Sequence, residues 1–280
     1  MKYIIVSDSS SDILTLNKVN FKSVPLKIST DEKEFTDNSN LNVSEMVTYL
    51  KQYKGKSKSS CPNIQEWKDA FEGYSNIICV TITSNLSGSY NAAKLALDEH
   101  LSEHPKKKGF VIDTLSAGPE IALIIEKLQQ LILKRLPFEE IEKQIMEYKN
   151  TTHLLFSLDS LTNLANNGRV NPAVAKIAGL LGIRAVGQAS MEGTLELLSK
   201  VRGSDKAISE IYKLMNKMGY IGGKVRIHHC QNKNGAKSLE REIKRIFPAS
   251  PVEIQETRGL CSFYAEIGGL LVGFEGKAKS

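Results

Sequence analysis

The sequence is poor in cysteine and has no long hydrophobic run. Its four cysteines are widely spaced and form no C-x-x-C pair, which argues against disulfide bonds and against a zinc site. The first apolar run, residues 3–6, is too short for a signal peptide, and no segment approaches the length of a membrane span. We therefore expect a cytoplasmic protein with no integral membrane segment, no metal ion and no cofactor.

The sequence also lacks the common motifs of nucleotide and ester chemistry. It contains no G-x-x-x-x-G-K-[ST], no G-x-G-x-x-G after a predicted strand and no G-x-S-x-G. The formal net charge is +6, with lysines clustered at residues 51–58 and 106–108, but no recognisable nucleic-acid-binding motif accompanies them. We interpret these clusters as solvated surface and expect no nucleic acid as a partner, although the excess charge would favour an acidic partner or an anionic ligand.

Predicted strands and helices alternate through the first half of the chain. The predicted strands are residues 2–6, 21–28, 77–82 and 110–112, and the predicted helices are residues 44–53, 64–72, 90–103, 119–134 and 137–149. Such alternation implies right-handed crossover connections and a mainly parallel sheet with helices on both faces. Pro25 interrupts the second strand, which suits a position at the edge of the sheet.

The second half mixes strands and helices differently. The predicted strands are residues 153–157, 185–190, 195–200, 225–229, 252–256 and 270–274, and the predicted helices are residues 205–218 and 236–247. This order indicates a second α/β unit with a mixed sheet. At 280 residues the chain is long enough for two domains, and we predict α/β domains over residues 1–150 and 151–280.

The most informative stretch is the hydroxyl-rich segment at residues 83–90, TSNLSGSY, between a predicted strand and a helix. Free N–H groups at the helix N-terminus and rotatable serine hydroxyls would face an anion there. Loops at residues 7–12 and 113–118 also follow strands and are rich in Ser, Thr and Asp. Ligands bind beyond the carboxyl ends of parallel strands, so we expect these loops to form one site, although each alone is also typical of a turn with a helix cap.

Two arginines and two histidines are weaker candidates. Arg169 follows an Asn-Gly turn and Arg202 follows a predicted strand, positions that suit recognition of a phosphate or an acidic partner. His228 and His229 end a strand, so one side chain points to each face of the sheet. Each of these residues is also compatible with an ordinary surface or structural role.

Five segments, taken in order, resemble the DegV family: residues 6–9 (VSDS), 59–62 (SSCP), 84–90 (SNLSGSY), 111–114 (VIDT) and 164–169 (LANNGR). The resemblance covers nearly the whole chain. It implies an N-terminal three-layer α/β domain, a C-terminal two-layer α/β domain and one long-chain fatty acid bound between them. It also implies similarity to the B subunits of bacterial fatty acid kinase, which present the carboxylate to a separate kinase subunit for phosphorylation by ATP.

The resemblance assigns a carboxylate site to three residues. Ser59 stands where the family often has threonine, and its hydroxyl would bind the carboxylate together with the hydroxyl of Ser87 and the amide of Gly88. Neutral donors of this kind would hold the carboxylate without neutralising it through a close lysine, which would leave it available for phosphorylation.

The resemblance also implies a polar rim where the pocket would meet the kinase subunit. Arg169, Arg202 and His229 match family positions on this rim. Many members carry a histidine within a Gly-Thr-His-Thr-Gly-Pro-Gly segment near the C-terminus. Residues 258–269 read RGLCSFYAEIGG here, and Tyr264 takes the place of that histidine.

Three functions are open at this point. The first is a fatty acid carrier with no catalytic residue of its own. The second is a serine-dependent acyl hydrolase that uses Ser87, with His228 or His229 as the base. The third is a phosphate-binding or kinase-like module, given a resemblance in fold to dihydroxyacetone kinase domains. We favour the carrier because the nucleophile elbow of hydrolases and the histidine and metal-binding carboxylate pattern of such kinases are absent.

Overall fold

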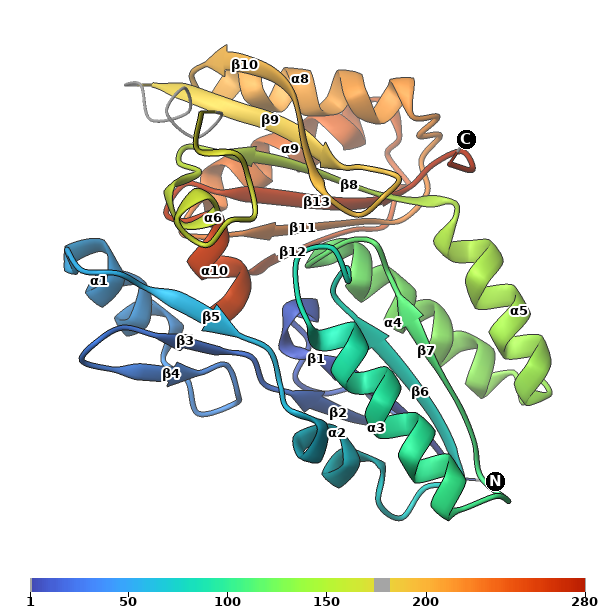
Figure 1. Cartoon of the computed structure of the whole chain (residues 1–280). Coiled ribbons are helices and arrows are strands. Elements are labelled where there is room, and N and C mark those ends of the chain that lie inside the picture. The colour runs from blue at the N-terminus through green and yellow to red at the C-terminus, as the bar shows by residue number, and fades with distance from the viewer. Residues whose placement is uncertain (1, 174–181, 280) are drawn as a thin grey trace.

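The computed structural model describes residues 2–173 and 182–279. Over these residues the chain is a mixed α/β fold with three β-sheets (Figure 1). Sheet A has the strand order β2-β1-β6-β7, sheet B the order β4-β3-β5, and sheet C the order β10-β9-β8-β13-β11-β12. None of the helices in these two ranges combines the length and the apolar character that a membrane span requires.

Sheet A consists of parallel strands, namely β1 (Tyr3–Asp8), β2 (Asn20–Val24), β6 (Asn76–Thr81) and β7 (Lys108–Asp113). Its two faces are covered by two pairs of helices, α2 (Ile64–Phe71) with α3 (Ser89–Glu103) and α4 (Pro119–Leu133) with α5 (Phe138–Lys149). Strands buried on both faces read as continuous apolar runs, as residues 77–80 do. The predicted parallel sheet with helices on both faces is confirmed.

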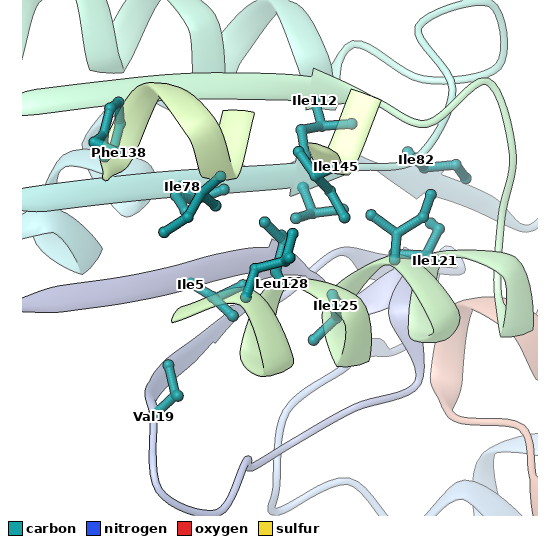
Figure 2. Packing of buried hydrophobic residues seen from close by; sticks show 14 of the residues in the cluster. Ile5, Val19, Ile78, Ile82, Ile112, Ile121, Ile125, Leu128, Phe138 and Ile145 are labelled. Carbon is teal, nitrogen blue, oxygen red and sulfur yellow. The ribbon is translucent and has the colours of Figure 1, made fainter. Parts of the chain in front are cut away.

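The core between sheet A and helix α4 shows how this packing arises (Figure 2). Ile5, Ile78 and Ile112 come from three neighbouring strands and are fully buried. Ile121 and Leu128 lie two turns apart on α4, so both face the sheet. Burying a side chain of this size contributes about 1.5–3 kcal/mol, so this core anchors the strands from which the site loops emerge.

The single strand predicted at residues 21–28 is wrong, because Pro25 divides it. The first part is β2, at the edge of sheet A as expected, and the second is β3 (Lys27–Ser29), in sheet B. Proline has no N–H to donate, so the ladder ends at this residue. Strand β3 pairs antiparallel with β4 (Glu34–Thr36) and β5 (Lys58–Ser60). The sequence did not predict sheet B because strands of three residues are too short to show a period.

Sheet C is mostly antiparallel and contains the six strands predicted in the second half. They are β8 (Thr152–Leu158), β9 (Ile183–Ala189), β10 (Leu195–Arg202), β11 (Val225–His229), β12 (Val252–Glu256) and β13 (Leu270–Glu275). Only the β11–β12 pair is parallel among these strands. Helices α8 (Ser204–Lys217) and α9 (Lys233–Ile246) cover one face, and the other face turns towards the strand ends of sheet A (Figure 1).

Three short elements connect the sheets. Helix α10 (Gly259–Ala265) lies between β12 and β13 of sheet C in the sequence but packs against β3 and against α1 (Val43–Gln52) (Figure 1). Helix α6 (Thr162–Asn166) follows β8, and a 3-10 turn, Ser9–Ser11, follows β1. Sheets A and B thus come from residues before 150 and sheet C from residues after it, with α10 reaching back. The division into domains at residue 150 stays a prediction.

Candidate functional site

The three hydroxyl-rich loops meet at one edge of sheet A, as predicted. Each follows the carboxyl end of β1, β6 or β7, and these strands are neighbours. The N–H of Thr83 donates to the carbonyl of Ser116 at 2.9 Å, and the N–H of Gly118 donates to the carbonyl of Ser10 at 2.9 Å. Backbone hydrogen bonds therefore join all three loops into one rim.

A cavity of about 270 Å³ lies between this rim and the inner face of sheet C. Most of its wall is apolar and is formed by Leu26, Ile82, Ala117, Leu154, Phe156, Leu158, Leu164, Leu195, Leu260, Ala265 and Leu271. The polar lining side chains that carry hydrogen-bonding groups lie together, because Ser59 bonds to Tyr264, the loop of Ser87 bonds to Arg169, and the charge of Arg169 is close enough to act on the Tyr264 phenol. The cavity therefore has a polar end and an apolar remainder.

Ser59 and Tyr264 form one side of the polar end. Ser59 is the middle residue of β5 and Tyr264 belongs to α10, and their hydroxyl oxygens lie 2.6 Å apart. Burial raises the pKa of the Tyr264 phenol, so this group stays neutral and keeps its proton at neutral pH. One hydroxyl donates to the other, which leaves one proton of the pair free to donate to a ligand.

Ser87 and Gly88 form the other side. The N–H of Ser89 donates to the Ser87 oxygen at 3.3 Å, so the proton of the Ser87 hydroxyl is free to donate elsewhere. Gly88 is the N-cap of α3 and has no side chain to satisfy the first N–H groups of that helix. A side chain at position 88 would press on the sulfur of Cys61, because a Cβ there would lie 3.2 Å from it. Ser87 and Gly88 thus bring the N-terminus of α3 to the cavity wall, where Gly88 provides no side-chain cap.

Arg169 connects α6 to this loop and brings a positive charge to the polar end. Its Nε donates to the carbonyl of Leu86 at 3.1 Å, and its Nη1 donates to the carbonyl of Asn167. The preceding Gly168 has a φ of +73°, a left-handed conformation that favours glycine and turns the chain towards the cavity. The structure therefore brings Ser59, Ser87, Gly88, Arg169 and Tyr264 to one place.

Neither Arg202 nor His229 lines the cavity. The expected place on a polar rim is wrong for His229, which is buried, and stays a prediction for Arg202, which is exposed. Arg202 is exposed at the last position of β10, two residues beyond Lys200, which pairs with Ala185 and through it lies level with the lining residue Leu158. His229 is 2% exposed, and its Nδ1 accepts the N–H of Asn232 at 3.3 Å. Alternate residues of β11 face opposite sides, so this ring points away from the cavity side.

His228, on the opposite face of β11, is part of a buried hydrogen-bonded pair. Its Nδ1 lies 2.7 Å from Oδ2 of Asp12, and both side chains are buried. The only hydrogen bond of the Ser87 hydroxyl within the described ranges is the one from Ser89, so no histidine is bonded to it. In the same ranges no three His, Cys, Asp or Glu side chains gather as metal ligands would.

The apolar lining from sheet C was missed by the sequence analysis. Leu154, Phe156 and Leu158 alternate along β8, and Leu271 adjoins them on β13. The alternation was visible in the sequence, but it shows only that two faces exist and not which of them covers a cavity. Leu155 lies on the opposite face and packs with helices α8 and α9. Only this contact, which the sequence does not show, identifies the face of Leu154, Phe156 and Leu158 as the one that covers the cavity.

Comparisons with known proteins agree on one family. A family model described as "Uncharacterised protein, DegV family" matches residues 2–276. A DegV domain-containing protein of Streptococcus pyogenes serotype M1 is 43% identical over 279 residues, which cover 98% of this chain and 100% of that protein.

Two solved structures are similar over the whole chain. The Fatty Acid Kinase (Fak) B3 protein of Streptococcus pneumoniae, loaded with linoleic acid, is 43% identical with a TM-score of 0.97, over 99% of this chain and 100% of that one. A DegV family protein of Eubacterium eligens, loaded with heptadecanoic acid, is 43% identical with a TM-score of 0.96, over 98% and 100%. The family model and these relatives establish that the chain belongs to the DegV family.

Proposed function

We propose that this protein binds one long-chain fatty acid, with the tail in the apolar part of the cavity and the carboxylate at its polar end. The observation that carries the proposal is the cavity itself, which is apolar over most of its wall and has hydroxyl and N–H donors at one end. Two relatives with 43% identity hold a fatty acid in their solved structures, which supports the same ligand class here.

Three residues receive the carboxylate in this proposal. The hydroxyls of Ser59 and Ser87 and the N–H of Gly88 donate to its two oxygens, and the open N-terminus of α3 adds a favourable dipole. Tyr264 orients Ser59 through their shared hydrogen bond, and the guanidinium of Arg169 supplies a nearby positive charge.

The two ends of the ligand contribute differently to binding. Each buried methylene contributes about 0.8 kcal/mol, so a tail of many carbons dominates the affinity. A charge-assisted hydrogen bond contributes about 1.5–3 kcal/mol and depends on direction, so the polar end fixes orientation. This division suits a carrier that must present one particular end of its cargo.

We further propose that the protein is a carrier without catalytic residues of its own. It presents the carboxylate to a separate fatty acid kinase subunit, which forms the acyl phosphate. The name of the Streptococcus pneumoniae relative, Fatty Acid Kinase B3 protein, supports this partner. The cytoplasm stays the predicted location, and docking of the kinase at Arg202, which is exposed, stays a prediction.

The acyl hydrolase alternative has no support in the site. A serine nucleophile needs a base within hydrogen-bond reach, and the described contacts of the Ser87 hydroxyl include only the backbone N–H of Ser89. His228 is already bonded to Asp12, and His229 faces Asn232. A chromogenic ester assay on the wild type and on Ser87→Ala tests this, and we expect no serine-dependent turnover.

The lipid itself is the direct test of the binding proposal. Mass spectrometry of an organic extract of the purified protein should find about one acyl chain per chain of protein. Delipidated protein should then take up an added fatty acid to the same ratio. Absence of stoichiometric lipid, together with no binding of added fatty acids, contradicts the proposal.

The kinase proposal needs a second experiment. Loaded protein, ATP and a bacterial fatty acid kinase subunit are combined, and acyl phosphate is trapped with hydroxylamine. We expect the hydroxamate only when all three components are present. Formation without the kinase subunit contradicts the carrier role, and no formation with it contradicts the partner.

A further inference from the structure

Asp8 is a fully buried carboxylate at the end of β1, beneath the loop that carries Ser87 and Gly88. Its Oδ1 accepts the N–H and the hydroxyl of Ser10, and its Oδ2 accepts the N–H of Ile82 at 3.0 Å and the hydroxyl of Ser89 at 2.6 Å. These four donors fill the acceptor capacity of an ionised carboxylate.

The two donors to Oδ2 bracket the site loop. Ile82 is the last residue before the loop and Ser89 is the first residue of α3, so one oxygen fixes both ends of residues 83–88. Ser89 also donates its N–H to the oxygen of Ser87. A chain of two hydrogen bonds therefore runs from Asp8 through Ser89 to the Ser87 hydroxyl.

The buried position of Asp8 disfavours its ionised form. Among the described residues no lysine, arginine or histidine lies within ion-pair distance of Asp8, and burial raises its pKa. A protonated Asp8 would carry an O–H and could not accept all four donors. The side chain thus orders one loop of the site without lining the cavity itself.

We propose that Asp8 is a positioning residue that fixes Ser87 and Gly88 in the direction the fatty carboxylate needs. This inference rests on the proposed function, because it concerns the head group of the same ligand. Asp8 does not line the cavity, so its effect on the ligand is transmitted through Ser89 and the ends of the loop.

The test compares a fatty acid with the alcohol of the same length. Tetradecanoic acid and tetradecanol, both delivered from cyclodextrin, bury the same tail but differ in the charged head group. In Asp8→Asn an NH₂ group replaces one carboxylate oxygen and cannot accept a hydrogen bond. It therefore faces the N–H of either Ser10 or Ile82, and that hydrogen bond is lost. We expect the preference for the acid to fall about tenfold, the loss of one charge-assisted hydrogen bond, while tetradecanol binds as before.

A matched control separates positioning from loss of stability. Leu239→Ala removes a fully buried side chain from α9, on the far face of sheet C. It should lower the melting temperature but keep the wild-type preference for the acid. If Asp8→Asn keeps the wild-type preference as Leu239→Ala does, the positioning role is overturned.

A double-variant cycle identifies the route. If Asp8 acts through Ser87, Ser87→Ala should weaken acid binding several-fold in the wild type but by less than twofold in Asp8→Asn. Additive effects overturn the route. Should Asp8→Asn fail to fold, Ser89→Ala breaks the same chain of hydrogen bonds with less disturbance, and an unchanged acid preference in that variant overturns the inference. A wild type that binds acid and alcohol equally contradicts the proposed carboxylate site itself, and binding of neither contradicts the whole function.

Discussion

The polar end and the apolar remainder of the cavity are built in different ways. The polar end is assembled from β5, α10, the loop at residues 83–88 and Arg169, which follows α6. One hydrogen bond joins β5 to α10, and another joins Arg169 to the loop. The apolar remainder is formed largely by one face of sheet C and by residues at the carboxyl edge of sheet A. The polar end depends on individual donor atoms that point in fixed directions. The apolar remainder depends only on apolar surface that lies close to the ligand.

This difference separates orientation from affinity. In the proposed binding mode, donors at the polar end decide which end of a fatty acid is presented, whereas the apolar wall decides how tightly the molecule is held. A change at the polar end should therefore alter discrimination between head groups with little effect on the contribution of the tail. A change in the apolar wall should affect all ligands of the same length alike.

The length of the tail should produce the largest effect. Hexadecanoic acid has four more methylenes than dodecanoic acid, so we expect it to bind about 3 kcal/mol more tightly, or roughly 200-fold. Calorimetry or a displacement assay on delipidated protein measures the ratio. The same ratio should hold in Ser87→Ala, because that variant changes only the polar end. Equal affinities for the two acids contradict a tail-dominated cavity.

The second-largest effect should come from a polar group placed in the apolar wall. Leu271 lines the cavity from β13, and in Leu271→Gln an amide without a partner would face the tail. Such a group costs about 1–3 kcal/mol, so the acid and the alcohol should both bind roughly 10- to 100-fold more weakly. Leu198→Gln makes the same change at an exposed position of β10 and should leave both affinities unchanged. A loss confined to the acid contradicts the division between the two ends.

The sequence predicted the parts that local patterns encode. Alternating strands and helices gave sheet A, and the edge position of β2 followed from Pro25. The serine-rich turn before α3 was recognisable as a site because strand ends and helix N-termini have local signatures. These features depend on residues close together in the chain.

Contacts between distant segments could not be predicted from such patterns. The hydrogen bond between Ser59 and Tyr264 joins residues 205 positions apart, and the one from Arg169 reaches the carbonyl of Leu86, 83 positions away. Only the family resemblance singled out Ser59 and Tyr264. His229 was placed wrongly because a strand end has no signature for the direction in which its side chain points in the folded protein.

The free energy of unfolding should depend on pH through Asp37, which holds the start of α10. Asp37 accepts the N–H groups of Gly259 and Leu260 at the start of α10, and burial raises its pKa from 3.8 to about 6. The folded chain then binds this proton more tightly than the unfolded chain does. The stabilisation from protonation is fully present below about pH 4 and is lost as the pH rises through 6.

Urea unfolding at pH 7 and pH 5 measures this contribution. On going to pH 5 the wild type should gain about 1 kcal/mol relative to Asp37→Asn, which has no carboxyl group to titrate. Other groups titrate in both proteins and cancel in the difference. An equal change in the two proteins would show that Asp37 does not titrate in this range.

The smallest effect should come from the phenol of Tyr264. Tyr264→Phe keeps the ring that packs at the cavity but removes the hydroxyl that orients Ser59. Ser59 then retains its own proton, so the carboxylate loses alignment and not a donor. We expect acid binding to weaken by about 0.5–1.5 kcal/mol, with tetradecanol affected less.

A second tyrosine provides the matched control for this variant. Tyr220 is also buried and its hydroxyl bonds to a serine, Ser250, but the pair lies in the core between sheet C and helices α8 and α9. Tyr220→Phe therefore removes the same kind of hydrogen bond and should lower stability comparably without changing the affinity for the acid. If the two variants alter binding equally, the hydroxyl of Tyr264 acts only through stability. If only Tyr264→Phe reduces the preference for the acid, the polar end depends on the direction of a single neutral hydroxyl, and the contribution of the apolar wall to binding does not depend on that hydroxyl.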